Sequence, residues 1–272
     1  METVNSTQSL RRASLKGLVF IAAGLLLLGW LLNTPAGILG KADAVGYAVC
    51  HRIDVRSFHI GDRALPLCAR CSGMFLGAAL GLAFQSIFFP RRTGTPPWYI
   101  LVILALFVAA FAVDGLNSYL HLFENAPNVY EPQNWSRLVT GTGMGITISV
   151  GMYLAFNQTV WKGWDQRPAI HGWVPLAGLI FLAGIMNLLV LSENSFVLYP
   201  LALISAGSVL VLLTMIYTMV LIMLFRRENT YERFQSVLFP LLGGFIIALL
   251  QVAATDYLRF LLTGTWGGFP IG

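Results

Sequence analysis

All three cysteines of the chain, Cys50, Cys68 and Cys71, lie in one arginine-rich stretch between two apolar segments. The same stretch contains His51 and His59, two of the four histidines. Zinc prefers thiolate and imidazole ligands, and a Cys-x-x-Cys pair brings two thiolates onto one ion at a turn. These residues therefore predict a zinc site with three cysteine ligands and one histidine ligand.

The fourth ligand is either His59 or His51, and we favour His59. Adjacent residues of an extended chain point in opposite directions, so Cys50 and His51 do not easily share one ion. Four protein ligands would make a closed, structural site, whereas three would leave a position open. An open position would permit a metal-dependent hydrolase or transferase that acts on a lipid.

The pair formed by Cys68 and Cys71 also fits a membrane thiol–disulfide oxidoreductase. A thiol at a helix N-terminus has a lowered pKa because the exposed N–H groups favour the thiolate, and Arg70 adds positive charge. An outward-facing location would permit a disulfide, with Cys50 as the resolving thiol. The odd number of cysteines favours a metal, and their concentration in a polar stretch counts against mere apolar packing.

The cysteine stretch also carries Arg52, Arg56, Arg63 and Arg70. Long basic side chains at a membrane surface commonly extend toward the lipid headgroups. Alternatively, these arginines form a cationic vestibule for an anionic lipid or a small anionic ligand, because guanidinium groups bind phosphate and carboxylate with two hydrogen bonds.

Asp114 and Arg137 are the candidate catalytic residues, because ionisable groups inside apolar segments are costly and face a cavity or a partner. Asp114 could hydrogen-bond a metal ligand, act as a base or carry a proton. Alternatively, Asp114 and Arg137 form a buried salt bridge. A transporter would use both along its path, but the inner halves of the predicted spans lack obvious charged residues.

The rest of the chain is strongly apolar. Of the 272 residues, 57% are hydrophobic and 11% are charged, whereas a soluble domain carries about 25% charged residues. This composition excludes a water-soluble fold and predicts an all-α, polytopic transmembrane helical bundle in one membrane domain. The formal net charge is +5, but the basic residues flank apolar segments, so we attribute them to membrane orientation and expect no nucleic-acid partner.

Seven segments are apolar and long enough to cross about 30 Å of hydrocarbon. They are residues 17–39, 68–89, 98–123, 136–158, 173–191, 196–225 and 234–262, and a basic tail, residues 1–16, precedes them. Residues 41–67 and 124–135 are predicted polar loops. A cleaved signal peptide is the alternative for the first segment, but the Ala-x-Ala site at residues 42–44 lies far beyond the apolar run.

Lysine and arginine positions predict the orientation of the bundle. If the N-terminus is cytoplasmic, most basic residues face inward, and the arginines of the cysteine stretch are the exception. The inward-facing residues are then Arg11, Arg12, Lys16, Arg91, Arg92, Lys162, Arg167, Arg226, Arg227 and Arg233. Asp114, Arg137, Asp256 and Arg259 would share the outer layer of the membrane with the cysteines.

Two blocks of residues resemble the signature of a family. The first contains Cys50-His51, Arg56-Ser57-Phe58 and Pro66-Leu67-Cys68-x-Arg70-Cys71-x-Gly73; the second contains Asp114-Gly115 and Asn134-x-x-Arg137-x-x-Thr140-Gly141. Both blocks are similar to a family of bacterial integral membrane proteins catalogued as a domain of unknown function, number two thousand and eighty-five.

This resemblance covers residues 47–151. It implies that the two blocks form one unit in a bacterial plasma membrane, and it implies no activity, substrate or cofactor. The three predicted spans within residues 173–262 look like an added extension.

Overall fold

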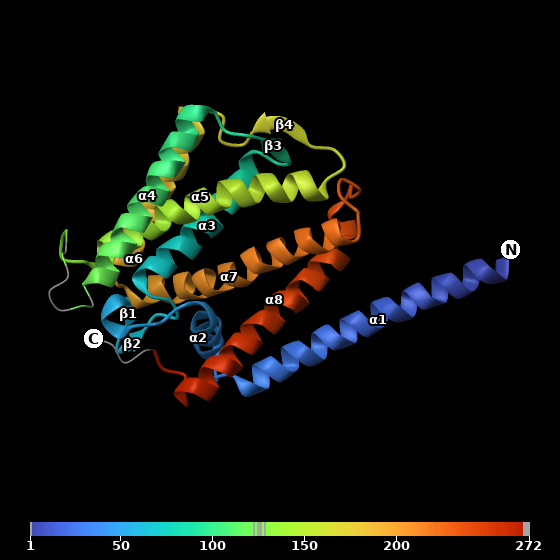
Figure 1. Cartoon of the computed structure of the whole chain (residues 1–272), viewed down its shortest axis with the longest axis horizontal. Coiled ribbons are helices and arrows are strands. Elements are labelled where there is room, and N and C mark those ends of the chain that lie inside the picture. Colours follow the sequence, from blue (N-terminus) through green and yellow to red (C-terminus); the bar gives the residue numbers. More distant parts are fainter. Residues whose placement is uncertain (1, 122, 124–126, 128, 269–272) are drawn as a thin grey trace.

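The computed structural model describes residues 2–121, 123, 127 and 129–268, and their side chains from residue 17 onward. Eight α-helices occupy most of this described part (Figure 1). They are α1 (Glu2–Asn33), α2 (Ile38–Val49), α3 (Ala69–Phe88), α4 (Trp98–Leu120), α5 (Asn134–Val160), α6 (Trp173–Leu191), α7 (Ser195–Leu224) and α8 (Phe234–Thr263).

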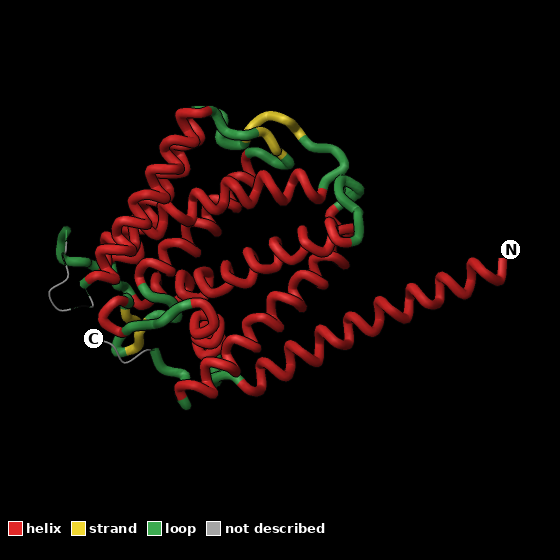
Figure 2. Tube along the Cα trace, in the orientation of Figure 1, coloured by secondary structure: helices red, strands yellow, loops and turns green. Residues whose placement is uncertain are grey.

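Short strands lie only at the two ends of the described bundle (Figure 2). Strand β1 (His59–Ile60) pairs antiparallel with β2 (Arg63–Ala64), next to a 3₁₀ turn, η1 (Asp54–Arg56). At the opposite end, β3 (Arg92–Gly94) pairs in parallel with β4 (Asp165–Pro168).

The protein is an all-α, polytopic membrane protein. Six helices, α3 to α8, are each long and apolar enough to cross a membrane. The segment Gly17–Asn33 of α1, together with α2, supplies a seventh span if the two helices, bent by 101° at their break, are counted as one. The predicted fold class is confirmed, and the ends of α3 to α8 differ from the predicted spans by only a few residues.

The connection after the first helix differs from the prediction. The segment 17–39 is not one helix, because α1 ends at Asn33 and is followed by Pro35 and by Gly37, whose φ is 80°. Proline lacks an N–H group and glycine adopts positive φ without strain, so both end a helix. The start of the predicted polar stretch 41–67 is instead the buried helix α2, which packs on α7 and α8.

The predicted tail, residues 1–16, continues as helix α1 from Glu2, and Met1 lies outside the described residues. Residues 124–126 and 128 of the predicted loop 124–135 also lie outside them. The division into a core and a three-helix extension stays a prediction.

Helices α3 and α5 approach each other at backbone distance along small residues. A Cβ atom added at Gly73 would lie 2.2 Å from the carbonyl oxygen of Leu138, and one at Gly141 would lie 2.2 Å from that of Arg70. Small residues permit such close contact between membrane helices. This contact fixes the start of α3, with its Cys-x-x-Cys pair, beside the first turn of α5, which carries Arg137.

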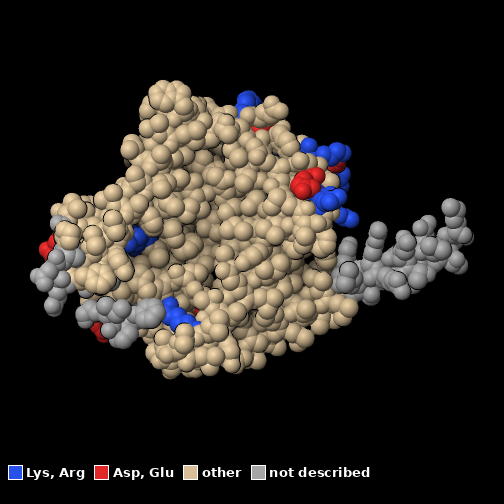
Figure 3. Space-filling view, in the orientation of Figure 1, with Lys and Arg blue, Asp and Glu red and all other residues tan. Residues whose placement is uncertain are grey.

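The helix ends form two faces. We call the end that carries Cys50, Cys68 and Cys71 the cysteine face; it contains α2, β1, β2 and the start of α3 (Figure 1). The opposite face contains β3, β4 and the loop between α7 and α8. Charged side chains gather there in Figure 3, and the belt between the faces is mostly uncharged in this view. This distribution fits the predicted orientation, which stays a prediction.

Candidate metal centre and the surrounding arginines

The ligand atoms of Cys50, Cys68 and Cys71 all lie within 4.8 Å of one another, and the three thiols are free of disulfides. Cys50 ends α2, Cys68 precedes α3 as its N-cap, and Cys71 lies in the first turn of α3. Cys50 and Cys68 are buried and Cys71 is partly buried. Sulfurs bound to one tetrahedral zinc ion lie about 3.8 Å apart, given zinc–sulfur bonds of about 2.3 Å, so a small adjustment would accommodate an ion.

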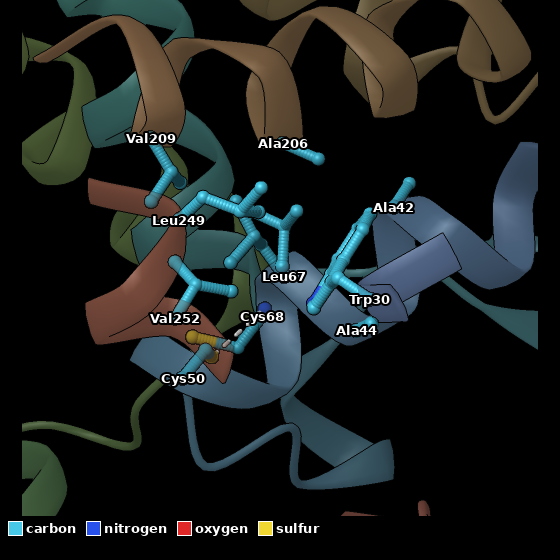
Figure 4. Close-up of a cluster of buried hydrophobic side chains, with 11 residues drawn as sticks. Trp30, Ala42, Ala44, Cys50, Leu67, Cys68, Ala206, Val209, Leu249 and Val252 are labelled. Carbon is cyan, nitrogen blue, oxygen red and sulfur yellow. Dashed lines mark hydrogen bonds between the residues drawn. The ribbon is translucent and has the colours of Figure 1, made fainter. Parts of the chain in front are cut away.

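Backbone N–H groups point at the sulfur of Cys50. The amides of Arg52 and Cys68 each donate to this Sγ atom at 3.4 Å, and Figure 4 shows the contact between Cys50 and Cys68. Hydrogen bonds from amides stabilise a thiolate and orient it as a metal ligand. The turn after α2, in which Arg52 has a φ of 52°, therefore prepares Cys50 for an anionic role.

Cys50 accepts hydrogen bonds from the other two thiols. Hydrogen bonds from Cys68 and then Cys71 hold the pKa of Cys50 well below its usual range, although burial opposes this shift. The hydrogen bond to Cys50 is also the main reason that the pKa of Cys68 is raised to about 12. A cation among the sulfurs would take the place of these protons, because metal binding requires thiolates and releases protons.

The two histidines occupy different positions. His59, the favoured fourth ligand, lies in β1, and its Nε2 atom is 3.1 Å from the Oδ1 atom of Asp54. The structure does not bring His59 to the sulfurs. The side chain of His51 instead interacts with the thiol of Cys50 and helps to lower its pKa, although its ring nitrogens are not part of the mutually close set. His51 is therefore the imidazole nearer to the candidate centre.

Helices α7 and α8 form an apolar wall behind the cysteines. Val209 of α7 and Leu249 and Val252 of α8 belong to the same buried cluster as Cys50 and Cys68 (Figure 4). This wall limits the access of water to the buried sulfurs, and it comes from the part of the chain that looked like an added extension.

Arg259 of α8 fastens the segment that carries Cys50. Its guanidinium group donates to the carbonyl oxygens of Tyr47 at 2.6 Å, Cys50 at 2.5 Å and His51 at 3.3 Å, and its carbon Cζ lies 4.0 Å from the centre of the Tyr47 ring. Sequence reasoning placed Arg259 in this layer without a role. An arginine near the end of an apolar segment was the available signal.

Asp43 of α2 is a further residue whose role the sequence did not reveal. Its carboxylate accepts hydrogen bonds from Arg52, at 2.9 Å, and from Arg63. Asp43 lies in a segment that the sequence analysis interpreted as a loop, so the sequence did not predict its burial. These two ion pairs hold the cysteine stretch against α2 and occupy two of the four arginines of the predicted vestibule.

Asp114 pairs with Arg70 and not with Arg137, which corrects the predicted salt bridge. The Nε atom of Arg70 donates to Asp114 Oδ2 at 3.1 Å, and Nη2 donates to the same oxygen and to the Asp114 carbonyl oxygen, the latter at 2.9 Å. The guanidinium group lies beside Gly115, where an added Cβ atom would make an ordinary van der Waals contact with Arg70 Nη1 at 3.8 Å. Arg137 instead donates to Asn134 Oδ1 at 2.8 Å.

A family model matches the part of the chain that forms this site. The model of the family described as "Predicted membrane protein (DUF2085)" matches residues 50–152. The matched region is similar to that membrane family. It includes the three cysteines, Asp114 and Arg137, and it ends before α6.

Two relatives, both described as uncharacterised proteins, match a segment about as long as the one that the family model matches. The protein MJ1492 of Methanocaldococcus jannaschii is 27% identical over 121 residues, which are 44% of this chain and 70% of the relative. An uncharacterised protein of Methanothermobacter thermautotrophicus is 28% identical over 102 residues, which are 38% of this chain and 82% of the relative. No solved structure matches. Both relatives are archaeal, so the comparisons do not support the predicted bacterial source.

Proposed function

We propose that this chain is a membrane metal-binding protein whose thiolates of Cys50, Cys68 and Cys71 hold one zinc ion. The observation that carries this proposal is the convergence of the three sulfurs. Cys50 lies beside the Cys-x-x-Cys pair although it is 18 residues from Cys68 in the sequence. Soft thiolate ligands select zinc, Cu(I) or iron–sulfur clusters, and a tetrahedral zinc site accepts three cysteines and one histidine.

His51 is the proposed fourth ligand, because its side chain interacts with the thiol of Cys50 whereas His59 is paired with Asp54. This ligand set makes the centre closed and structural: it joins the end of α2 to the start of α3. We place the protein in the plasma membrane with the cysteine face outward, in agreement with the basic residues of the opposite face.

Elemental analysis of the purified full-length protein tests the proposal. We expect about one zinc ion per chain after exposure to zinc and removal of excess metal, because the proposed ligands would form one tetrahedral site. A folded preparation that takes up no transition metal would contradict the proposal.

The two histidines provide a matched pair of variants. His51→Ala should weaken zinc binding at least about tenfold, as expected for loss of a ligand or of its hydrogen-bonded support, whereas His59→Ala should leave zinc affinity unchanged. Competition with a zinc chelator measures both affinities. If only His59→Ala loses zinc affinity, His59 is the fourth ligand. If neither variant loses zinc affinity, the fourth position is open, as a hydrolase or transferase would require.

A thiol–disulfide oxidoreductase is the second candidate function, favoured by the positions of Cys68 at the N-cap and Cys71 in the first turn of α3. It predicts a reversible disulfide between these residues in protein isolated under oxidising conditions. Mass-resolved thiol labelling before and after reductant counts the free thiols. Three labelled thiols without reductant, in zinc-free protein, would reject this candidate.

A further inference from the structure

Arg56 and Arg137 bring two positive charges close to Cys68. Arg137, in the first turn of α5, is only 6% exposed, and its Nε atom is buried without a hydrogen-bond acceptor. The guanidinium group of Arg56 donates from Nη2 to the carbonyl oxygen of Ser118 at 3.2 Å. Within the described residues, no carboxylate oxygen forms an ion pair with either guanidinium group.

The nearby aspartate is already satisfied by other groups. Asp114 Oδ2 accepts from Arg70, and Asp114 Oδ1 accepts from the hydroxyl groups of Tyr130 at 2.6 Å and Ser136 at 3.3 Å. Asp114 therefore forms its ion pair with Arg70, although its charge also attracts Arg137. Arg56 and Arg70 both donate to Ser118, through its carbonyl and its hydroxyl oxygen respectively. Among the described residues, three arginines thus lie near one aspartate, so two positive charges are in excess.

This excess charge is unfavourable in a partly buried layer. Like charges repel more strongly at low dielectric, and a buried guanidinium group loses its hydration. Burial and the charge of Arg70 accordingly lower the pKa of Arg56, although arginine stays protonated in proteins. An anion that accepts hydrogen bonds from both guanidinium groups would relieve the repulsion and satisfy the buried Nε atom of Arg137.

We propose that Arg56 and Arg137 form a binding site for one phosphate group, carried either by a lipid headgroup or by free inorganic phosphate. Guanidinium groups bind tetrahedral oxyanions through pairs of charge-assisted hydrogen bonds. Arg70 is a positioning residue, because Asp114 and Ser118 occupy its donors. Arg52 and Arg63 take no part, because both bind Asp43.

The site lies next to the proposed metal centre, since both Arg56 and Arg137 interact electrostatically with Cys68. The phosphate site rests on the proposed function only through this proximity. A zinc ion with three thiolates carries one net negative charge and could itself neutralise the two arginines. The binding of phosphate is therefore measured with zinc present and with zinc removed.

The test uses the full-length protein with two probes. Equilibrium dialysis in detergent measures the binding of inorganic phosphate. Native mass spectrometry of protein reconstituted in phosphatidylcholine with phosphatidylglycerol measures a retained anionic lipid. We expect one bound phosphate or one retained phosphatidylglycerol per chain, weakened at least about tenfold in Arg56→Gln and in Arg137→Gln, because hydrogen bonds between charged groups are the strong ones.

Arg227→Gln is the matched control, because it removes the same charge from the exposed loop between α7 and α8 on the opposite face. Its binding should equal that of the unaltered protein. Saturable phosphate binding without lipid retention identifies free phosphate as the ligand, and the reverse result identifies a phospholipid; both support the site. If Arg137→Gln loses helical content, Arg56→Gln supplies the test from outside the α-helices.

Two results would overturn the phosphate site. The first is that Arg56→Gln and Arg137→Gln bind both probes as well as the control Arg227→Gln does. The other is a complete loss of anion binding when zinc is removed from protein that stays folded, because the ion would then be the binding group. Failure of zinc uptake alone would reject the metal centre and leave the phosphate measurement valid.

Discussion

Cys68→Ser and Cys71→Ser should each reduce bound zinc from about one ion per chain to near zero. A serine hydroxyl group stays protonated at neutral pH and is a poor zinc ligand, since the ligand must be deprotonated. Loss of a partner that only supports a ligand lowers metal affinity about 10–100-fold, so loss of a ligand itself should exceed a hundredfold. Chelator competition followed by elemental analysis measures the change.

The same substitutions should lower the thermal stability of zinc-loaded protein, because a metal that binds only the folded chain stabilises it. Cys68 is 3% exposed, so burial of the new hydroxyl group could also destabilise the fold. Cys68→Ala controls for this, since it removes the sulfur without adding a polar group. Zinc content and affinity in Cys68→Ala equal to those of the unaltered chain would reject Cys68 as a ligand.

Gly141→Ala should destabilise the bundle by about 3 kcal/mol or more, at the high end of overpacking substitutions. The added Cβ atom would lie 2.2 Å from the carbonyl oxygen of Arg70 and 3.1 Å from the backbone nitrogen of Met74. Neither backbone atom can move aside as a side chain could, so α3 and α5 must separate. Because α3 begins with the Cys-x-x-Cys pair, we also expect weaker zinc binding.

Gly151→Ala is the control within the same helix. No atom lies within 4 Å of a Cβ atom added there, and alanine favours the helical state over glycine by about 0.5–1 kcal/mol. Thermal unfolding in detergent, followed by helical signal and by zinc release, should therefore separate the two variants clearly. Equal midpoints for Gly141→Ala and Gly151→Ala would mean that α3 and α5 do not pack at this distance.

The sequence alone determined the class of the fold. Segments such as 98–123 and 196–225 are too apolar for water and long enough for a bilayer, and a chain in lipid must satisfy its backbone hydrogen bonds within helices. The sequence also indicated the chemistry of the candidate site, because the ligand preference of zinc is a property of residue type and the spacing of Cys68 and Cys71 brings two sulfurs to one turn.

Only the tertiary structure decided which side chains meet. Asp114 of α4 pairs with Arg70 of α3, 44 residues away in the sequence, because the packing of the bundle brings the two side chains together. Helix α2 was hidden because its stability comes from burial against α7 and α8, and local sequence pattern does not report burial. The partners of Arg259 likewise depend on how helices rotate and cross, because they lie more than 200 residues away in the sequence.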